Sequence, residues 1–314
     1  MSLILFTLNI VAPIFLLIVI GIFLKRINLI NDLFVSQTSK FVFKVSLPAL
    51  IFLKIASVKI TQAFDGKLIL TSLILVLIIA GFSWILSSLL TKVPKEKGVF
   101  VQGSFRSNFA IIGLALIANL IGEEQLGKAS LVLAFVMPLY NILAVIVLTV
   151  PFRGKKKYNY FQTIKEIGKN PLIIAALLAA PFSILKVELG LIFITTLTYL
   201  SKIALPLALI SIGASLNLKS LKEASKLSFI AMFNKLVTFP LLAILVGIYF
   251  EFNSNQLTIL FILFASPTAI ASFIMADAMG SNSKLASDII VLSTLFSIIT
   301  LSTGIIIMKY YSFI

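Results

Sequence analysis

Two short polar segments interrupt long apolar stretches of the chain, and their residue types suit anion binding. The first is Arg106-Ser107-Asn108 and the second is Ser266-Pro267-Thr268. Each segment lies about ten residues into an apolar run, which is roughly 15 Å at the rise of an α-helix. Pro267 lacks an N–H and its ring clashes with the carbonyl four residues earlier. We therefore expect two helix breaks near the middle of a membrane.

These breaks predict two half-helices whose N-termini meet. Serine followed by proline is typical of a helix N-cap and first helical residue, so we expect Ser266 to cap the second half-helix. Asn108 or Ser107 would cap the first. Helix N-termini offer free N–H groups and a partial positive charge, and the Asn108 amide adds two donors. This pattern indicates a carboxylate site, although a proline kink beside an asparagine that joins helices would also fit.

Three further polar residues within apolar runs are candidate contacts for such an anion. Arg106 lies one turn before the first break and Lys235 lies about eight residues into its own run, where it could also pair with Asp277. Both cations would alternatively snorkel to the membrane surface. Asn141 either lines the site or joins two helices by a hydrogen bond.

The composition requires lipid around the chain. Of the 314 residues, 60% are apolar and 12% are charged, whereas soluble proteins carry about 25% charged residues. The absence of cysteine and histidine excludes disulfides and thiolate metal sites and removes the usual acid–base group. We therefore expect an all-α membrane protein with no metal site, no organic cofactor and no enzymatic activity.

The net charge of +15 follows the pattern of membrane topology rather than nucleic-acid binding. Most lysines and arginines lie between apolar runs, and segment 151–170 is the richest in them. Basic loops stay in the cytoplasm. We therefore expect a multi-pass protein of the cell (inner) membrane, with segment 151–170 in the cytoplasm and both termini outside. Binding of lipid headgroups by the basic loop is the alternative.

The apolar runs are long enough for ten spanning helices, since each needs about 20 residues. The expected spans are 5–24, 37–57, 68–91, 98–121, 128–150, 171–187, 191–216, 227–250, 256–279 and 286–309.

The two halves of the chain resemble each other at a nearly fixed offset. Lys44 to Pro48 matches Lys202 to Pro206 at an offset of 158 residues, and Pro13 matches Pro171 at the same offset. The two polar segments are related by 159 residues. Five spans per copy would make the repeat inverted, as in many secondary carriers. We expect repeats at 1–150 and 171–314, joined by the basic loop 151–170.

These motifs resemble those of the auxin efflux carrier family, which includes PIN-formed and malate-permease-like carriers. Phe105 to Leu114 resembles the fourth-span motif, and Ser266 to Ser272 resembles the ninth-span motif. Leu292 to Leu295 and the Leu-Pro-Ala that includes Pro48 fit as well. Ala115 and Ser302 depart from the family pattern, which usually has proline at both places.

The resemblance implies a fold similar to the bile acid sodium symporters, with helices 4 and 9 crossing where they unwind. Helices 1, 2, 6 and 7 would form a scaffold, and helices 3–5 and 8–10 would form a transport domain. Pro48, Gly113, Pro206 and Pro267 would break or bend helices. The expected substrate is a small carboxylate that resembles malate or auxin.

We therefore expect a secondary transporter of small organic anions that works by alternating access. An anion channel or a transporter-like sensor of the same fold is the alternative. No carboxylate lies at mid-depth in the predicted spans, which argues against a central acid as a proton relay, while sodium coupling stays open. Membrane lipids are expected neighbours, and a homodimer is left open.

Overall fold

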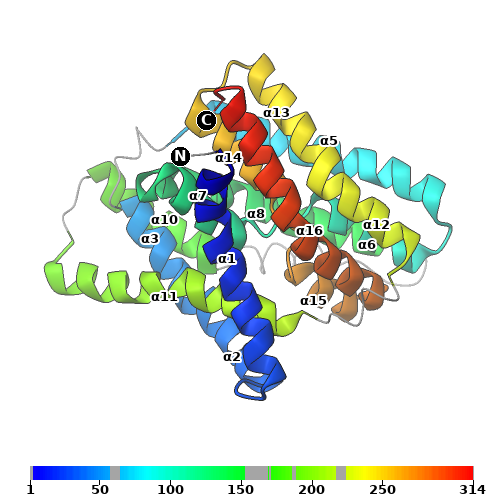
Figure 1. The fold of residues 1–314 in the computed structure, drawn as a ribbon, viewed down its shortest axis with the longest axis horizontal. Coiled ribbons are helices and arrows are strands. Elements are labelled where there is room, and N and C mark those ends of the chain that lie inside the picture. Colours follow the sequence, from blue (N-terminus) through cyan, green and yellow to red (C-terminus); the bar gives the residue numbers. More distant parts are fainter. Residues whose placement is uncertain are drawn as a thin grey trace.

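The computed structural model describes residues 3–56, 64–152, 169, 171–185, 189–216 and 224–313. Most of the basic loop 151–170, including Arg153 and Lys155 to Lys157, therefore lies outside the described residues. The described residues form helices and no strand (Figure 1). The helices are α1 (Leu3–Arg26), α2 (Asp32–Phe41), η1 (Val42–Ser46), α3 (Leu47–Ala56), α5 (Gly66–Leu90), α6 (Pro94–Phe105), η2 (Phe109–Gly113), α7 (Leu114–Ile121), η3 (Glu123–Gln125), α8 (Leu126–Thr149), η4 (Val150–Phe152), α10 (Pro171–Leu185), α11 (Leu191–Ser215), α12 (Lys226–Phe233), η6 (Asn234–Thr238), α13 (Phe239–Tyr249), α14 (Ser254–Ala265), α15 (Ala271–Ala278) and α16 (Ser283–Tyr310).

Helices are the expected result, because a segment in lipid has to satisfy its backbone hydrogen bonds within itself. Among the described residues, six helical stretches are long and apolar enough to cross a membrane. They are Leu5–Arg26, Gly66–Leu90, Glu123–Thr149, Leu191–Ser215, Lys226–Tyr249 and Ser283–Tyr310. The other four predicted spans correspond to shorter or interrupted helices, so a total of ten crossings stays a prediction.

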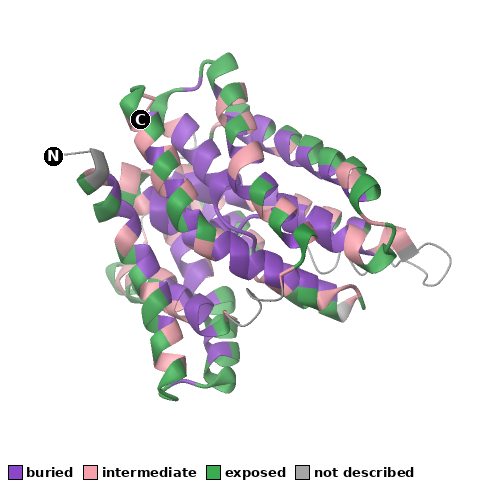
Figure 2. Cartoon of the chain, turned by 45° about the vertical axis from the view of Figure 1, so that its right-hand side comes forward, coloured by how far each residue is buried: buried purple, intermediate pink, exposed green. Residues whose placement is uncertain are grey.

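The outward faces of these helices remain apolar where they are exposed. On α5, for example, Leu77, Ile85 and Leu89 are exposed, whereas Leu75, Val76 and Ile79 on the same helix are buried. Figure 2 shows the same division over the whole molecule, with buried residues gathered inside and exposed ones along the outer helix faces. Such a surface suits a lipid environment and not water.

The helices gather into two groups that meet along α8, and α1 joins the first group to α16. Helices α2, α3, α10 and α11 pack together on one side, and α5, α6, α12 and α13 lie on the other (Figure 1). Helices α1 and α11 approach closely because Gly21 and Gly213 each face the backbone of the partner helix, at Ile210 and Ile18 respectively. Small residues permit such close packing in membranes.

Two π-helical turns are placed by prolines. Pro48 follows η1 and Pro240 follows η6, in both cases two residues after the turn ends. A proline removes one N–H and crowds the carbonyl four residues back, and a π-turn shifts the bonding by one residue. Pro48 thus accompanies a widened turn without ending the helical path. Helix α11 also continues through Pro206, so this residue does not break its helix.

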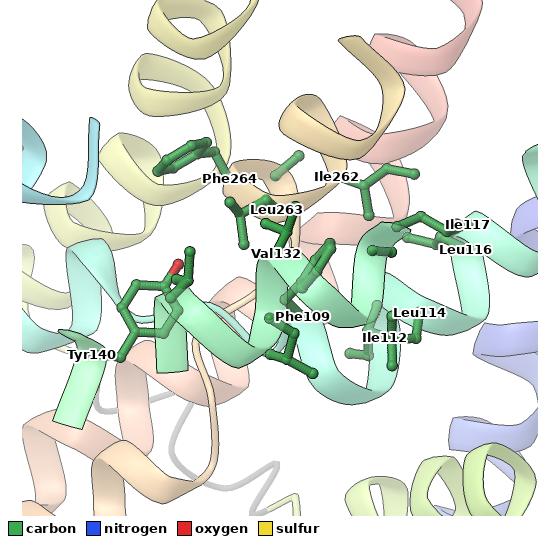
Figure 3. Packing of buried hydrophobic residues seen from close by; sticks show 14 of the residues in the cluster. Phe109, Ile112, Leu114, Leu116, Ile117, Val132, Tyr140, Ile262, Leu263 and Phe264 are labelled. Atoms are coloured by element: carbon green, nitrogen blue, oxygen red, sulfur yellow. The ribbon is translucent and has the colours of Figure 1, made fainter. Parts of the chain in front are cut away.

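The two predicted helix breaks are present. Helix α6 ends at Phe105 and helical structure resumes at Phe109, while α14 ends at Ala265 and α15 begins at Ala271. Gly113 ends the π-turn η2, and a side chain there would collide with the Phe109 ring. Figure 3 shows Phe109 and Ile112 packed with Leu263 and Val132 beside the first break. A tightly packed apolar cluster therefore holds both breaks in place.

Candidate substrate site

The two breaks cross and pair through their backbones. Ser107 and Thr268 form an isolated antiparallel bridge. The Asn108 N–H donates to the Pro267 carbonyl at 2.7 Å, and the Ala269 N–H donates to the Arg106 carbonyl at 3.3 Å. Since unwound backbone at membrane depth has to find partners, each break supplies the hydrogen bonds that the other needs.

Side chains of the second break are fastened to the surrounding protein. The Thr268 hydroxyl donates to the Gly103 carbonyl at 2.6 Å, and the Thr268 N–H donates to the Ser293 hydroxyl at 3.1 Å. The Ser107 hydroxyl lies 3.4 Å from the Ser266 carbonyl. Ser266 and Thr268 are both buried, so this break is locked into the core.

The prediction that Ser266 caps the second half-helix is wrong. Ser266 is instead the C-cap of α14, where its hydroxyl donates back to the Ile262 carbonyl at 2.7 Å. Pro267 lies in the extended segment rather than in the first turn of a helix. Asn108 does occupy the N-cap position of η2, but its side chain makes no capping hydrogen bond. The crossing pairs extend the break by several residues and move the second helix start to Ala271.

Arg106 is a buried cation with only neutral partners among the described residues. It is 8% exposed. One guanidinium nitrogen donates to the Asn141 side-chain oxygen at 2.7 Å, and another lies 2.7 Å from the Met275 sulfur. The ion pairs found in the described part of the chain all involve lysines. The positive charge of Arg106 is therefore positioned but not neutralised.

A cavity of about 1080 Å³ opens beside the first break. Arg106, Ser107, Asn108 and Asn141 all line it. Ser266, Pro267, Thr268 and Lys235 are not among its lining residues, and the second break contributes residues 269–271 instead. The structure thus brings together half of the predicted site residues around one space.

The cavity walls combine apolar surface with basic residues. Ile111, Met137 and Ile270 are among the apolar residues of the wall. Lys40, Lys44 and Lys284 also line the cavity, together with Asp32. Helix α2, the C-terminal part of α11 and the N-terminal part of α16 contribute to the lining. The cavity therefore lies between elements that are far apart in the sequence.

Free backbone donors also face this region. The N–H groups of residues 109, 110, 270 and 271 have no hydrogen-bond acceptor among the described residues. They stand at the first turns of η2 and α15, where helices leave their N–H groups unpaired. Ala110, Ile270 and Ala271 are cavity-lining residues. Both helix starts thus contribute residues to the cavity wall, and the binding of an anion by their N–H groups stays a prediction.

Lys235 lies away from the cavity, buried in the core. It is 1% exposed, and its ammonium donates to the Phe264 carbonyl at 2.8 Å. Asp277 is exposed, and the two residues form no ion pair. The predicted pairing with Asp277 is therefore wrong, because the lysine is held by the end of α14 instead.

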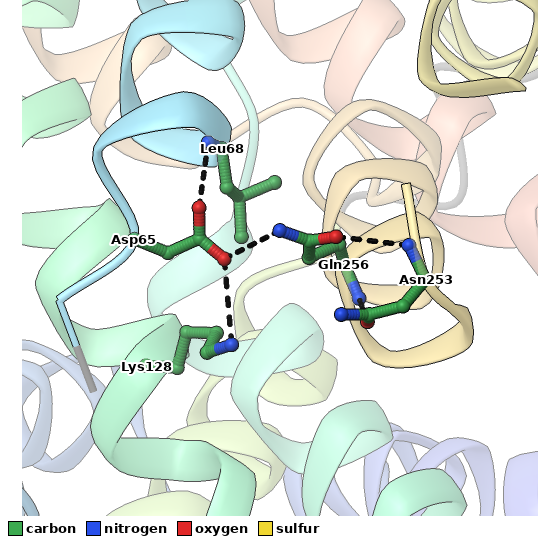
Figure 4. Close-up of polar contacts among 5 residues, drawn as sticks. All are labelled: Asp65, Leu68, Lys128, Asn253 and Gln256. Carbon is green, nitrogen blue, oxygen red and sulfur yellow. Dashed lines mark hydrogen bonds and ion pairs between the residues drawn. The ribbon is translucent and has the colours of Figure 1, made fainter. Parts of the chain in front are cut away.

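A second polar cluster lies where α5, α8 and α14 begin (Figure 4). Asp65 accepts hydrogen bonds from the Leu68 N–H at 3.0 Å and from Gln256 at 2.6 Å, and it pairs with Lys128 at 3.4 Å. Burial by itself would raise the pKa of Asp65, but these hydrogen bonds and the lysine charge outweigh it and lower the pKa below its ordinary value. The cluster ties together the N-terminal ends of α5, α8 and α14.

The described residues contain no group of three metal-binding side chains. The sequence pattern of the family described as "membrane transport protein" matches residues 6–305. The chain belongs to this family of membrane transport proteins. The family expected from the sequence motifs is thereby confirmed, and the chain is a transporter rather than an enzyme.

Curated relatives of this membrane transport protein span almost its entire length. An uncharacterised transporter of Methanocaldococcus jannaschii is 22% identical over 305 residues, which cover 94% of this chain and 96% of that protein. The uncharacterised transporter YfdV of Escherichia coli K12 is also 22% identical, over 96% of this chain and 97% of that protein. Both relatives are named as transporters without a stated substrate.

Several contacts of the transporter site could not be predicted from the sequence. Met275 and Gly103 carry no signal of their role as partners of Arg106 and Thr268, because a thioether and a glycine carbonyl are common everywhere. Ser293 belongs to a motif noted in the last predicted span, and its position there was the only available signal.

Proposed function

We propose that this membrane transport protein is a secondary transporter that carries a small organic anion by alternating access. The observation that carries the proposal is Arg106, a buried guanidinium that lines the cavity and has no carboxylate partner among the described residues. An unpaired buried charge is costly. A bound carboxylate would neutralise it with charge-assisted hydrogen bonds.

The surroundings of Arg106 support an anion. The side chain of Asn108 belongs to a residue that lines the cavity and makes no hydrogen bond among the described residues. Four backbone N–H groups of the two half-helices are also unpaired within the described part of the chain. Helix N-termini favour negative charge. Ser107 and Asn141 complete the polar part of the proposed site, while the apolar wall would hold the body of the substrate.

The proposed mechanism uses two inverted repeats, 1–150 and 171–314. The scaffold would comprise α1, α2–α3, α10 and α11, and the remaining spans would form the transport domain that carries the crossing. Rocking of one group against the other would move the anion between the two sides. In the proposed orientation, the basic loops lie in the cytoplasm and both termini of the protein lie outside the cell. The cavity would then be accessible from the cytoplasm.

The direct test compares wild-type protein with Arg106→Gln. Purified protein would be screened by thermal shift with malate, succinate, benzoate and indole-3-acetate, and the compound that stabilises wild type would then be used in radiolabelled form for uptake into proteoliposomes. We expect Arg106→Gln to reduce uptake to that of protein-free liposomes. Arg26→Gln is the matched control, because Arg26 lies at the end of α1 and does not line the cavity.

A counterflow experiment separates a transporter from an anion channel. Liposomes preloaded with unlabelled substrate should take up labelled substrate faster and to a higher transient level than empty ones, because each turnover exchanges one anion for another. A channel would show no such transient excess and would instead conduct current. Wild-type uptake that does not respond to preloading, or full uptake by Arg106→Gln, would overturn the proposal.

A further inference from the structure

The break in α14 leaves backbone carbonyls that need new partners. In an uninterrupted helix, the carbonyls of residues 263–265 would accept from the N–H groups four residues later. Pro267 has no N–H, the Thr268 N–H donates to Ser293, and the Ala269 N–H donates to the Arg106 carbonyl. The C-terminal end of α14 therefore presents a group of released carbonyls, and it also carries the negative end of the helix dipole.

Lys235 delivers a positive charge to this cluster. Its ammonium donates to the Phe264 carbonyl at 2.8 Å, and at 1% exposure it is among the most buried large side chains of the protein. No carboxylate of the described residues lies within ion-pair distance of it. The carbonyl end of α14 is thus its only counter-charge in the described part of the chain.

The geometry around Lys235 is held by an irregular turn. Lys235 lies within the π-turn η6, which precedes Pro240 and packs against α14 and α16. Its neighbour Asn234 is also buried, and the side-chain nitrogen of Asn234 has no hydrogen-bond partner. π-turns are rare and occur often at functional sites. The local structure therefore places a charged side chain where a regular helix would aim it elsewhere.

The same arrangement of groups binds free cations in other membrane proteins. Broken membrane helices coordinate Na⁺ through released carbonyls and the C-terminal ends of half-helices. An ammonium group carries the same charge and donates directly to such carbonyls. We propose that Lys235 is a tethered cation that fills the position where a free monovalent cation would bind at the end of α14. One consequence of this proposal is that substrate binding needs neither Na⁺ nor K⁺. Only that consequence rests on the proposed transport function.

The proposal predicts chemical rescue. Lys235→Ala removes the ammonium and leaves a space lined by the Phe264 carbonyl, which a small free cation can enter. Methylammonium replaces the lost donor, and Na⁺ replaces the lost charge. Lys235→Met keeps most of the volume but leaves neither a charge nor room for a cation.

The test is thermal unfolding of the purified protein in lipid nanodiscs, without substrate. Chloride salts of Na⁺, K⁺, methylammonium and N-methyl-D-glucamine would be compared at equal ionic strength. The wild-type midpoint should be the same in all four salts. The Lys235→Ala midpoint should lie about 4–10 °C lower in N-methyl-D-glucamine, and should rise saturably with methylammonium or Na⁺. Lys202→Ala is the control, because Lys202 is exposed on α11, and it should show neither effect.

Three results would overturn the proposal, and none depends on transport. The first is saturable stabilisation of wild-type protein by Na⁺, since the position would then be free. The second is a Lys235→Ala protein that no cation stabilises. If that variant does not fold, Lys235→Met decides the question, and a wild-type midpoint in Lys235→Met would be the third.

A binding measurement extends the test to the transport function. Wild-type affinity for the anion found in the thermal-shift screen should change less than about twofold when Na⁺ is replaced by N-methyl-D-glucamine, where a tenfold change would correspond to about 1.4 kcal/mol. A strict Na⁺ requirement in wild type would overturn the tethered-cation role even if anion transport is confirmed. Failure to find any transported anion would leave the unfolding result standing by itself.

Discussion

The two helix breaks meet at one point, yet they present different groups to the cavity. The first break carries Arg106, Ser107 and Asn108 on the cavity wall, whereas Ser266 and Thr268 of the second are buried behind it. The second contains the proline and the stronger set of side-chain hydrogen bonds. The comparison supports our proposal that one break recognises the ligand, and it shows that the other is fastened by side-chain hydrogen bonds to the surrounding protein.

The difference follows from how each break is produced. Pro267 interrupts its helix by itself, so the surrounding side chains are available to fasten the unwound backbone. The first break has no proline, and two backbone hydrogen bonds to the second break keep it open: the Asn108 N–H donates to the Pro267 carbonyl, and the Arg106 carbonyl accepts from the Ala269 N–H. Its side chains are therefore left free to face the cavity.

Arg106→Gln should have the largest effect on substrate binding. If it does not weaken binding, the first break does not recognise the ligand. We expect substrate affinity to fall about 10- to 100-fold, as for the loss of a charge-assisted hydrogen bond of about 1.5–3 kcal/mol. The unfolding midpoint without substrate should lie at or above that of wild type, because a buried unneutralised charge is removed. Isothermal titration and thermal unfolding measure the two quantities. A loss of stability with normal affinity would assign Arg106 a structural role.

Thr268→Val should show the opposite pattern. It removes the buried hydrogen bond to the Gly103 carbonyl and should lower the free energy of unfolding by about 1–3 kcal/mol. Affinity of the folded protein should stay within about threefold of wild type. Thr300→Val is the matched control, since Thr300 is only half-buried on α16 and its hydroxyl donates to the Phe296 carbonyl of its own helix. Equal effects in both variants would contradict the anchoring role.

Asn108→Ala sharpens the assignment of the first break. The side chain lines the cavity and makes no hydrogen bond within the described protein, so its removal should change the free energy of unfolding by less than about 0.5 kcal/mol. Loss of a neutral hydrogen bond of about 1 kcal/mol to the substrate should weaken binding roughly fivefold. Unchanged binding of the cognate anion would exclude Asn108 from the site.

The smallest effects should come from the ends of the two broken helices that lie farthest from the breaks. The Asp65 cluster holds the N-terminal end of α14, and an exposed pair between Glu123 and Lys54 follows the C-terminal end of α7. Because its folded pKa is lowered, Asp65 should stabilise the protein above its ordinary pKa of 3.8 and lose that contribution as the pH falls through the folded pKa. Asp65→Asn should cost about 1 kcal/mol at pH 7, with no difference from wild type at the acid end.

Glu123→Gln is the exposed counterpart of this measurement. Lys54 donates to the Glu123 carboxylate at 2.6 Å, but surface pairs contribute about 0–1 kcal/mol and are screened by salt. Unfolding curves from pH 7 down to pH 3 at low and high salt would rank the two anchors. A larger cost for Glu123→Gln than for Asp65→Asn would reverse the ranking.

Much of the fold was predictable because its causes are local. Apolar length fixes where helices run, and each of the ten predicted spans has a helical counterpart among the described residues. Both breaks were also predictable, from polar residues in apolar runs and from Pro267. The start of α15 was not predictable. The backbone of Thr268 pairs with Ser107, so the chain stays extended beyond Ser266 and the helix begins only at Ala271.

The sequence by itself determined that this protein is a helical membrane transporter with two interrupted helices, since hydrophobicity and proline chemistry act within a few residues. Only the tertiary structure decided which break faces the cavity and where Lys235 points. Those outcomes depend on contacts between segments far apart in the chain, such as Arg106 with Met275 and Lys235 with Phe264. Buried polar groups must find partners wherever the packing provides them, and no local pattern specifies that choice.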